Sequence, residues 1–223
     1  MDFSHTTPYV NAMKPKASPK TPRPRTEAMA ETREKLLDAG AELFAAHGLD
    51  GPSLDAICER AGFTRGAFYV HFEDRDDFMV AVMEREGLPF LDAVLGPARP
   101  GEEPPTFEAV VGRFLGAVAS GAYPLTRKSG PKPHQLLDAC ARSKKIRARY
   151  VALVADSITR VAQVVEASQE EGTLRRDVGA NDVATILLAA IIGGQTMMEL
   201  DAPIDLPRAG AAMLQLLARA PKR

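Results

Sequence analysis

Residues 54–72 read Leu-Asp-Ala-Ile-Cys-Glu-Arg-Ala-Gly-Phe-Thr-Arg-Gly-Ala-Phe-Tyr-Val-His-Phe and predict two short helices joined by a tight turn. Ser53 and Thr64 stand where a side-chain oxygen can accept hydrogen bonds from the unpaired N–H groups of a first helical turn. Gly62 suits the turn between them, because a residue without a Cβ adopts a positive φ at little cost. The stretch therefore predicts a helix-turn-helix.

The second of these helices begins with residues that suit contact with DNA. Gly66 and Ala67 are small, so the backbone can approach a groove closely. The guanidinium group of Arg65 carries a fork of donors that can reach a guanine edge or a phosphate. We expect the N-terminal end of this helix to face DNA.

Residues 61–72, followed by Arg75 and Phe78, resemble the signature of the tetracycline-repressor (TetR) family in order and spacing. The resemblance is strong over residues 32–80 and beyond them extends only to length and helical character. Cys58 departs from the usual Ala and Arg75 from the common Lys, but Cys packs as a small hydrophobe and Arg keeps the charge. The resemblance implies a repressor that binds a palindromic operator in double-stranded DNA as a homodimer. A small-molecule effector would release it.

We expect the DNA-contacting residues to divide by role. Arg65 is the best candidate for reading a base, whereas Tyr69 and His71 should support binding to all sequences alike. Arg33, Ser53 and Arg75 are expected on the flanking phosphates. The full predicted set is Arg33, Ser53, Thr64, Arg65, Gly66, Ala67, Tyr69, His71 and Arg75.

The rest of the 223-residue chain predicts an all-α protein, because apolar residues recur at helical spacing and no strand pattern is found. We expect three helices in a helix-turn-helix head, residues 27–73, and six in a body, residues 74–223, which would bind effector and dimerise. The first helix should begin between Thr26 and Thr32 and end at His47. The other expected helices begin near Ser53, Thr64, Asp74 and Thr106, and then cover 134–142, 145–171, 181–200 and 206–220.

Residues 1–26 hold five prolines and five basic residues against one acidic residue, so they cannot build a core and are expected to form a flexible arm. One interpretation is a basic arm that follows the DNA backbone or enters the minor groove. The other is a solubilising tail. Basic, proline-rich tails are common, so the sequence leaves both open.

The last two expected helices carry more apolar surface than one small subunit can hide. A self-complementary two-fold interface is favoured over an ordinary internal core, because palindromic operators require paired heads. In the family these helices form a four-helix dimer bundle. The predicted interface residues are Leu187, Ile191, Gly194, Met198, Met213 and Leu217.

An effector site is expected inside the body, since cavities between bundled helices are common ligand sites. The candidates combine bulk or a polar group with an inward position on the helical pattern, and plain core packing is the alternative for each. They are Phe114, Tyr123, His134, Cys140, Tyr150 and Gln195.

The sequence offers no catalytic residue, cofactor motif or metal site. Residues 129–132 match a Ser-x-x-Lys spelling but lie among prolines without the companion motifs, and the four histidines are scattered. The basic run 142–149 is interpreted as a solvated face rather than an anion site, and Cys58 and Cys140 as packing residues rather than redox sensors. Few cysteines, no signal peptide and no long apolar run indicate a cytoplasmic protein without a membrane span. The alternatives are a ligandless DNA-binding or structural module and an enzyme with a fused DNA-binding head.

Overall fold

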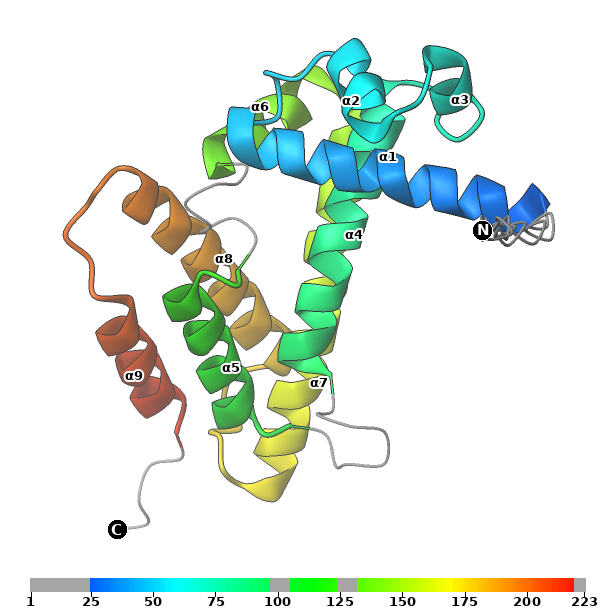
Figure 1. Cartoon of the computed structure of the whole chain (residues 1–223). Coiled ribbons are helices and arrows are strands. Elements are labelled where there is room, and N and C mark those ends of the chain that lie inside the picture. The colour runs from blue at the N-terminus through cyan, green and yellow to red at the C-terminus, as the bar shows by residue number, and fades with distance from the viewer. Residues whose placement is uncertain (1–24, 97–104, 124–131, 219–223) are drawn as a thin grey trace, which may run out of the picture.

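The computed structural model describes residues 25–96, 105–123 and 132–218, and helices dominate these ranges (Figure 1). Within these ranges Leu174 and Ala218 form an isolated antiparallel bridge, and there is no β-strand beyond this single pair. The all-α prediction is thereby confirmed. The predicted arm lies outside the described residues except for Arg25 and Thr26, which begin the first helix.

Four helices come first along the chain, and the first of them starts at Arg25, just before the predicted range Thr26 to Thr32, and ends at His47 as predicted. They are α1 (Arg25–His47), α2 (Leu54–Ala61), α3 (Arg65–Tyr69) and α4 (Arg75–Leu95). The side chain of Ser53 accepts from Ala56 N and that of Thr64 from Ala67 N, while Asp74 accepts from Asp77 N and caps α4. Gly62 closes α2 at φ 77°, the left-handed conformation expected of the turn.

Aromatic packing fixes α3 against α1 and α4. The ring of Phe68 lies 5.2 Å from Phe72 and 5.3 Å from Phe78, measured between centroids, and Phe44 of α1 lies 6.1 Å from Phe78. Gly40 makes this packing possible, since a Cβ there would come within 2.4 Å of Phe78 Cζ. Helix α3 has only five residues, and the packing of its buried Phe68 against these rings holds it in place.

The body contains α5 (Phe107–Ser120), α6 (Pro133–Arg142), α7 (Lys144–Glu171), α8 (Ala180–Glu199) and α9 (Leu206–Leu217). The starts of α6, α7 and α8 lie one residue before the predicted ones. Helix α9 ends at Leu217, and the predicted end at Ala220 lies outside the described residues. In Figure 1, α4 and α7 run along the molecule and α5, α8 and α9 lie together at the end away from α2 and α3.

Two hydrophobic cores result, and the first crosses the predicted boundary between head and body. It joins head residues such as Leu36 and Ile57 to Leu136, Ala139 and Cys140 of α6. The second core lies lower in the body, where α4, α5, α7 and α8 meet around the fully buried Val165. Helix α6 thus packs against the head, which the sequence pattern does not show.

Candidate DNA-binding surface and internal cavity

The exposed surface of α3 is formed by the residues predicted to meet DNA. Thr64, Arg65 and Gly66 are exposed, and Ala67 and His71 are half-buried. Tyr69 is 55% exposed although its ring packs against the edge of the buried Phe68. Val70, which the prediction omitted, is 63% exposed beside it. An apolar side chain at this position can meet a thymine methyl group.

Arg65 is held by a partner that the sequence prediction missed. Its Nη2 donates to Asp55 Oδ2 at 2.6 Å, and its Nε donates to Asp55 Oδ1. The hydrogen bond from Arg65 keeps the pKa of the Asp55 carboxyl below its usual value, so Asp55 is ionised at neutral pH. The spacing of ten residues crosses the turn, so only the folded helix-turn-helix brings the two groups together.

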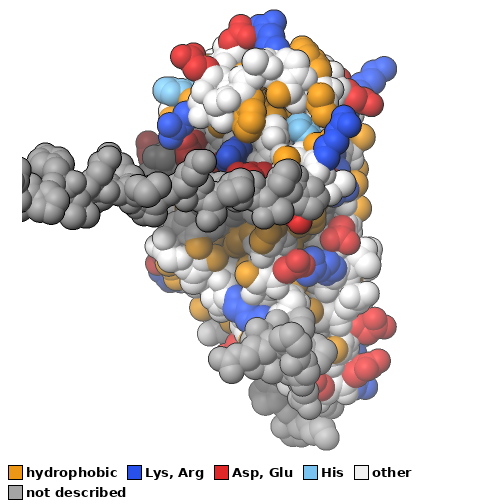
Figure 2. All heavy atoms as spheres, turned by 45° about the vertical axis from the view of Figure 1, so that its right-hand side comes forward, with side chains coloured by type: hydrophobic (Ala, Val, Ile, Leu, Met, Phe, Trp, Pro, Cys, Tyr) orange, Lys and Arg blue, Asp and Glu red, His pale blue; other side chains and the backbone are white. Residues whose placement is uncertain are grey.

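The residues predicted on the flanking phosphates have different surroundings. The guanidinium group of Arg33 lies 5.3 Å from the centroid of the Phe72 ring, and its side chain is 43% exposed. Ser53 caps α2 and stays exposed. Arg75 instead donates to the carbonyls of Leu49 and Pro52, at 2.6 and 3.1 Å, and thereby ties α4 to the loop before α2. Figure 2 shows Lys and Arg side chains spread over this end of the molecule among acidic ones.

A cavity of about 630 Å³ extends through the body and reaches the head. Its walls come from α1, α4, α5, α6, α7, α8 and α9. At one end it is lined by Phe44, Ala45 and Leu49, and at the other by Ala209 and Met213. This volume lies within the range of ligand pockets, roughly 300 to 1,000 Å³.

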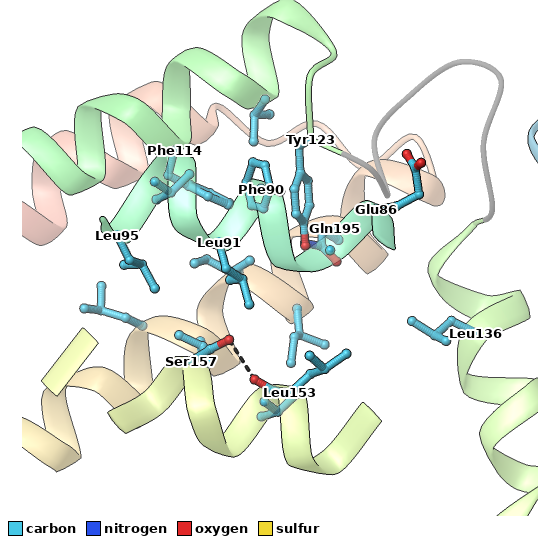
Figure 3. Close-up of a pocket in the computed structure, with 18 of the residues that line it drawn as sticks. Glu86, Phe90, Leu91, Leu95, Phe114, Tyr123, Leu136, Leu153, Ser157 and Gln195 are labelled. Carbon is cyan, nitrogen blue, oxygen red and sulfur yellow. Dashed lines mark hydrogen bonds between the residues drawn. The ribbon is translucent and has the colours of Figure 1, made fainter. Parts of the chain in front are cut away.

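The cavity wall is apolar apart from a few placed polar groups. Phe90, Phe114 and Tyr123 form an aromatic cluster with centroids 4.8 to 6.5 Å apart. The Tyr123 hydroxyl accepts a hydrogen bond from Gln195 Nε2, and Figure 3 shows these two side chains pointing toward one another. Burial raises the pKa of Tyr123 to about 12 against the opposing effect of Gln195, so the phenol is neutral at physiological pH.

Four of the six predicted effector residues line this cavity, namely Phe114, Tyr123, Tyr150 and Gln195. His134 does not, because its side chain is 67% exposed and its Nδ1 contacts the Glu199 carboxylate. Cys140 is buried in the first core, where burial raises its thiol pKa. The structure therefore separates these two residues from the other four.

The cavity also includes residues that the sequence prediction assigned elsewhere. Glu86 and Phe90 lie on α4, which was expected to act only as a connector (Figure 3). Their spacing of four residues places them on one helical face, which is the signal that could have found them. Leu136 of α6 also lines the cavity.

The predicted dimer residues face inward. Four of them line the cavity, namely Leu187, Ile191, Met198 and Met213. Gly194 is buried, and a Cβ built there would lie 3.1 Å from Leu206 Cδ2. Leu217 packs on the second core.

The exposed face of α8 carries other apolar residues. They are Ile186, Met197 and Leu200, which are 56%, 50% and 75% exposed. Ala190 and Gly193 lie between them at helical spacing. Within the described part of the chain, α8 is the one helix long and apolar enough to cross a membrane by length and composition, and 17% of that window is buried. Apolar side chains thus lie exposed along one face of α8.

Ion pairs connect the basic run 142–149 to acidic residues of the head and of α4. Arg142 Nη2 lies 2.6 Å from Asp50 Oδ1, and Lys145 Nζ lies 3.1 Å from Asp74 Oδ2. The Arg142 side chain is 52% exposed, as expected of a solvated face. Through these pairs the basic residues also connect the body to the head.

The described residues contain no cluster of three or more His, Cys, Asp or Glu that could hold a metal ion. Cys58 and Cys140 are both free thiols in the first core, and burial raises the pKa of each. A raised pKa keeps a thiol protonated and weakly reactive. This fits the packing role inferred for both.

Comparison with known families identifies the head. A model described as bacterial regulatory proteins, tetR family, matches residues 36–82, from within α1 to within α4. The transcriptional regulator SrpR of Pseudomonas putida is 40% identical over 100 residues, 43% of this chain and 44% of SrpR. The transcriptional repressor BepR of Brucella suis is 40% identical over 77 residues, 34% of this chain and 36% of BepR. The chain thus spans less than half the length of these two curated relatives, both named regulators rather than enzymes.

Solved structures extend the likeness of the fold to the body. SmeT is the repressor of the Stenotrophomonas maltophilia multidrug efflux pump SmeDEF. Its complex with triclosan aligns with a TM-score of 0.63 and 24% identity, over 83% of this chain and 88% of SmeT. Reduced NemR of E. coli aligns with a TM-score of 0.66 and 22% identity, over 86% and 98% of the two chains. Residues 36–82, which include the capped helix α3, thus match the TetR family of bacterial regulatory proteins, and the helical body shares the fold of these solved structures.

Proposed function

We propose that this protein is a transcriptional repressor that binds a palindromic operator as a homodimer and leaves it when an apolar effector enters the body. The observation that carries the proposal is the continuous cavity between head and body, which is lined by Phe44 and Leu49 at the helix-turn-helix and by Met213 at α9. A molecule in this cavity contacts both the DNA-binding part and the rest of the chain. Such a protein acts in the cytoplasm, where bacterial DNA is accessible.

The expected effector is a small, largely apolar molecule with aromatic character and one polar group. The Phe90, Phe114 and Tyr123 cluster offers ring faces and edges, and Gln195 with Tyr123 offers one hydrogen-bonding position. Transfer of an isolated charge into such a wall would be costly. The SmeT complex with triclosan supports a small-molecule ligand in this fold.

Dimerisation is supported by the exposed apolar face of α8. Ile186, Met197 and Leu200 would be buried against the same face of a second copy, and the small Ala190 and Gly193 between them permit close helix approach. Two heads arranged by such a two-fold interface suit two successive major grooves, about 34–36 Å apart.

Release of DNA requires the effector to bind one head arrangement better than another. Helices α4 and α6 are the candidates for transmitting this preference, because both line the cavity and both belong to the first core. The first core, in which Leu136 and Ala139 pack with head residues, couples α6 to the head, and the ion pair between Arg142 and Asp50 adds a surface contact. An effector that shifts α4 or α6 would thereby change the distance between the two recognition helices.

The experiment uses the full chain, an operator duplex selected from a random library, and triclosan with related aromatic compounds as probes. Fluorescence anisotropy should show sequence-dependent binding that at least one compound reverses. Leu153→Trp fills the cavity and should abolish that response while DNA binding persists. Val151→Trp, on the exposed side of the same helix, is the control that should respond normally. Absence of selective DNA binding would refute the proposal. Selective binding that no compound reverses would favour a ligandless module.

A further inference from the structure

The ion pair between Asp55 and Arg65 lies on the surface proposed to meet DNA. It joins the first turn of α2 to the first residue of α3 through two hydrogen bonds, one of 2.6 Å. The side chains are 66% and 58% exposed, so both remain accessible to a bound duplex. Exposed ion pairs contribute little to folding stability. The main effect of this pair is therefore expected on DNA binding.

The contact uses one edge of the guanidinium group and leaves another edge available. Asp55 accepts from Nε and from Nη2 of Arg65. The two protons of Nη1 and the second proton of Nη2 point away from the carboxylate, because the group is planar and its donors have fixed directions. A pair of parallel N–H donors matches O6 and N7 of guanine. Arg65 can therefore read a guanine without leaving Asp55.

The same contact offsets the positive charge of Arg65. Basic residues that neutralise phosphates release counterions and strengthen binding to every sequence alike. A carboxylate at hydrogen-bonding distance from the guanidinium group removes most of this effect and repels nearby phosphates. It lowers the sequence-independent part of DNA affinity and leaves the part that depends on the base.

We propose that Asp55 is a specificity-determining residue for operator recognition, which acts by holding Arg65 toward a guanine edge and away from the phosphates. This inference rests on the proposed DNA-binding function of α3. It predicts that the two residues act as a unit, so that the effect of removing Asp55 depends on the presence of Arg65.

The test is a double-mutant cycle with Asp55→Ala, Arg65→Ala and the double variant in the full chain. Each protein selects duplexes from a random library, and its affinity for the selected and a scrambled duplex is measured at several KCl concentrations. Asp55→Ala should lower the preference for guanine at one position roughly tenfold. It should bind the scrambled duplex more tightly, with a salt slope steeper by about 0.9. In the Arg65→Ala background, removing Asp55 should leave the base preference unchanged.

Glu59→Ala is the matched control, because Glu59 is an exposed carboxylate on the same helix. It should raise affinity for the scrambled duplex without changing the preferred base. The inference is wrong if Asp55→Ala keeps the guanine preference, or if it alters base preference equally when Arg65 is absent. If Arg65→Ala itself leaves base preference intact, the proposed reading of DNA through Arg65 fails first. Circular dichroism of each variant checks that it is folded, and none of these substitutions removes Ser53, the cap of α2.

Discussion

Gly66 occupies an exposed position of α3 where the free protein has room for a side chain. A Cβ built there would have Thr64 Oγ1, at 3.6 Å, as its nearest neighbour. Glycine is also less favourable than alanine within a helix. Neither packing nor helix formation accounts for the glycine, whereas the proposed close approach of the α3 backbone to a DNA groove would.

Gly66→Ala is therefore expected to keep the fold, to raise stability by up to about 1 kcal/mol, and to weaken operator binding. Thermal unfolding and anisotropy titration measure the two effects. Gly116→Ala is the control, because a Cβ at Gly116 in α5 meets nothing within 4 Å. It should raise stability without affecting DNA. Unchanged operator affinity in Gly66→Ala would show that α3 does not approach the groove at this residue.

Tyr123 and Gln195 form a hydrogen-bonded polar pair in the otherwise apolar wall of the cavity. Gln195 is 5% exposed, so Tyr123→Phe leaves its amide without the hydroxyl acceptor. The expected loss is about 1–3 kcal/mol in the free energy of unfolding, measured with urea. Tyr123→Phe combined with Gln195→Leu should cost less than the two single changes together, because neither partner is then left buried alone. Additive losses would argue against this hydrogen bond.

The start of helix α4 depends on its N-cap residue, Asp74. It accepts a hydrogen bond from Asp77 N and lies 3.1 Å from Lys145 Nζ. The backbone hydrogen bond from Asp77, with a further contribution from Lys145, lowers the pKa of Asp74 from its usual 3.8. A carboxyl with a lowered pKa stabilises the folded state while ionised, and this contribution is lost as it becomes protonated.

Asp74→Ala should lower the free energy of unfolding by about 1 kcal/mol at neutral pH, because the cap is lost. Asp74→Asn keeps a capping oxygen without the charge and should cost less. The difference between wild type and Asp74→Asn should be full above pH 5 or so and shrink as the pH falls through 3.8 and below. Denaturant titrations from pH 3 to 7 test this expectation. A difference that does not depend on pH would show that the Asp74 charge is not involved.

Helices and their ends could largely be predicted from sequence, because caps and breakers act locally. Ser53, Thr64 and Thr106 each cap the helix expected of them, and Gly62 ends α2. The partner of each helix could not be predicted in the same way. The helical pattern of residues 134–142 does not show that α6 packs against the head through Leu136.

The exposed apolar face of α8 is the proposed dimer interface of the protein. Replacing Met197 with Glu would place a charge in the proposed two-fold interface, where each copy faces its counterpart. We expect Met197→Glu to be monomeric in light scattering and to lose operator affinity, while its helical content is retained. Val151→Glu, at an exposed apolar site on α7, should remain dimeric. A dimeric Met197→Glu would exclude this face as the interface.

The amino-acid sequence was enough to predict the all-α class, because apolar residues recur at helical spacing along the chain. It was also enough to predict the helix-turn-helix and the surface residues of α3, because these depend on short spacings within residues 53–78. The tertiary structure decided what depends on distant partners. Arg75 donates to backbone carbonyls, Cys140 packs in the first core, and Phe90 joins Tyr123 in the cavity wall. A one-dimensional pattern shows that a side chain is buried or exposed. The group that it meets is fixed only when helices far apart in sequence pack together.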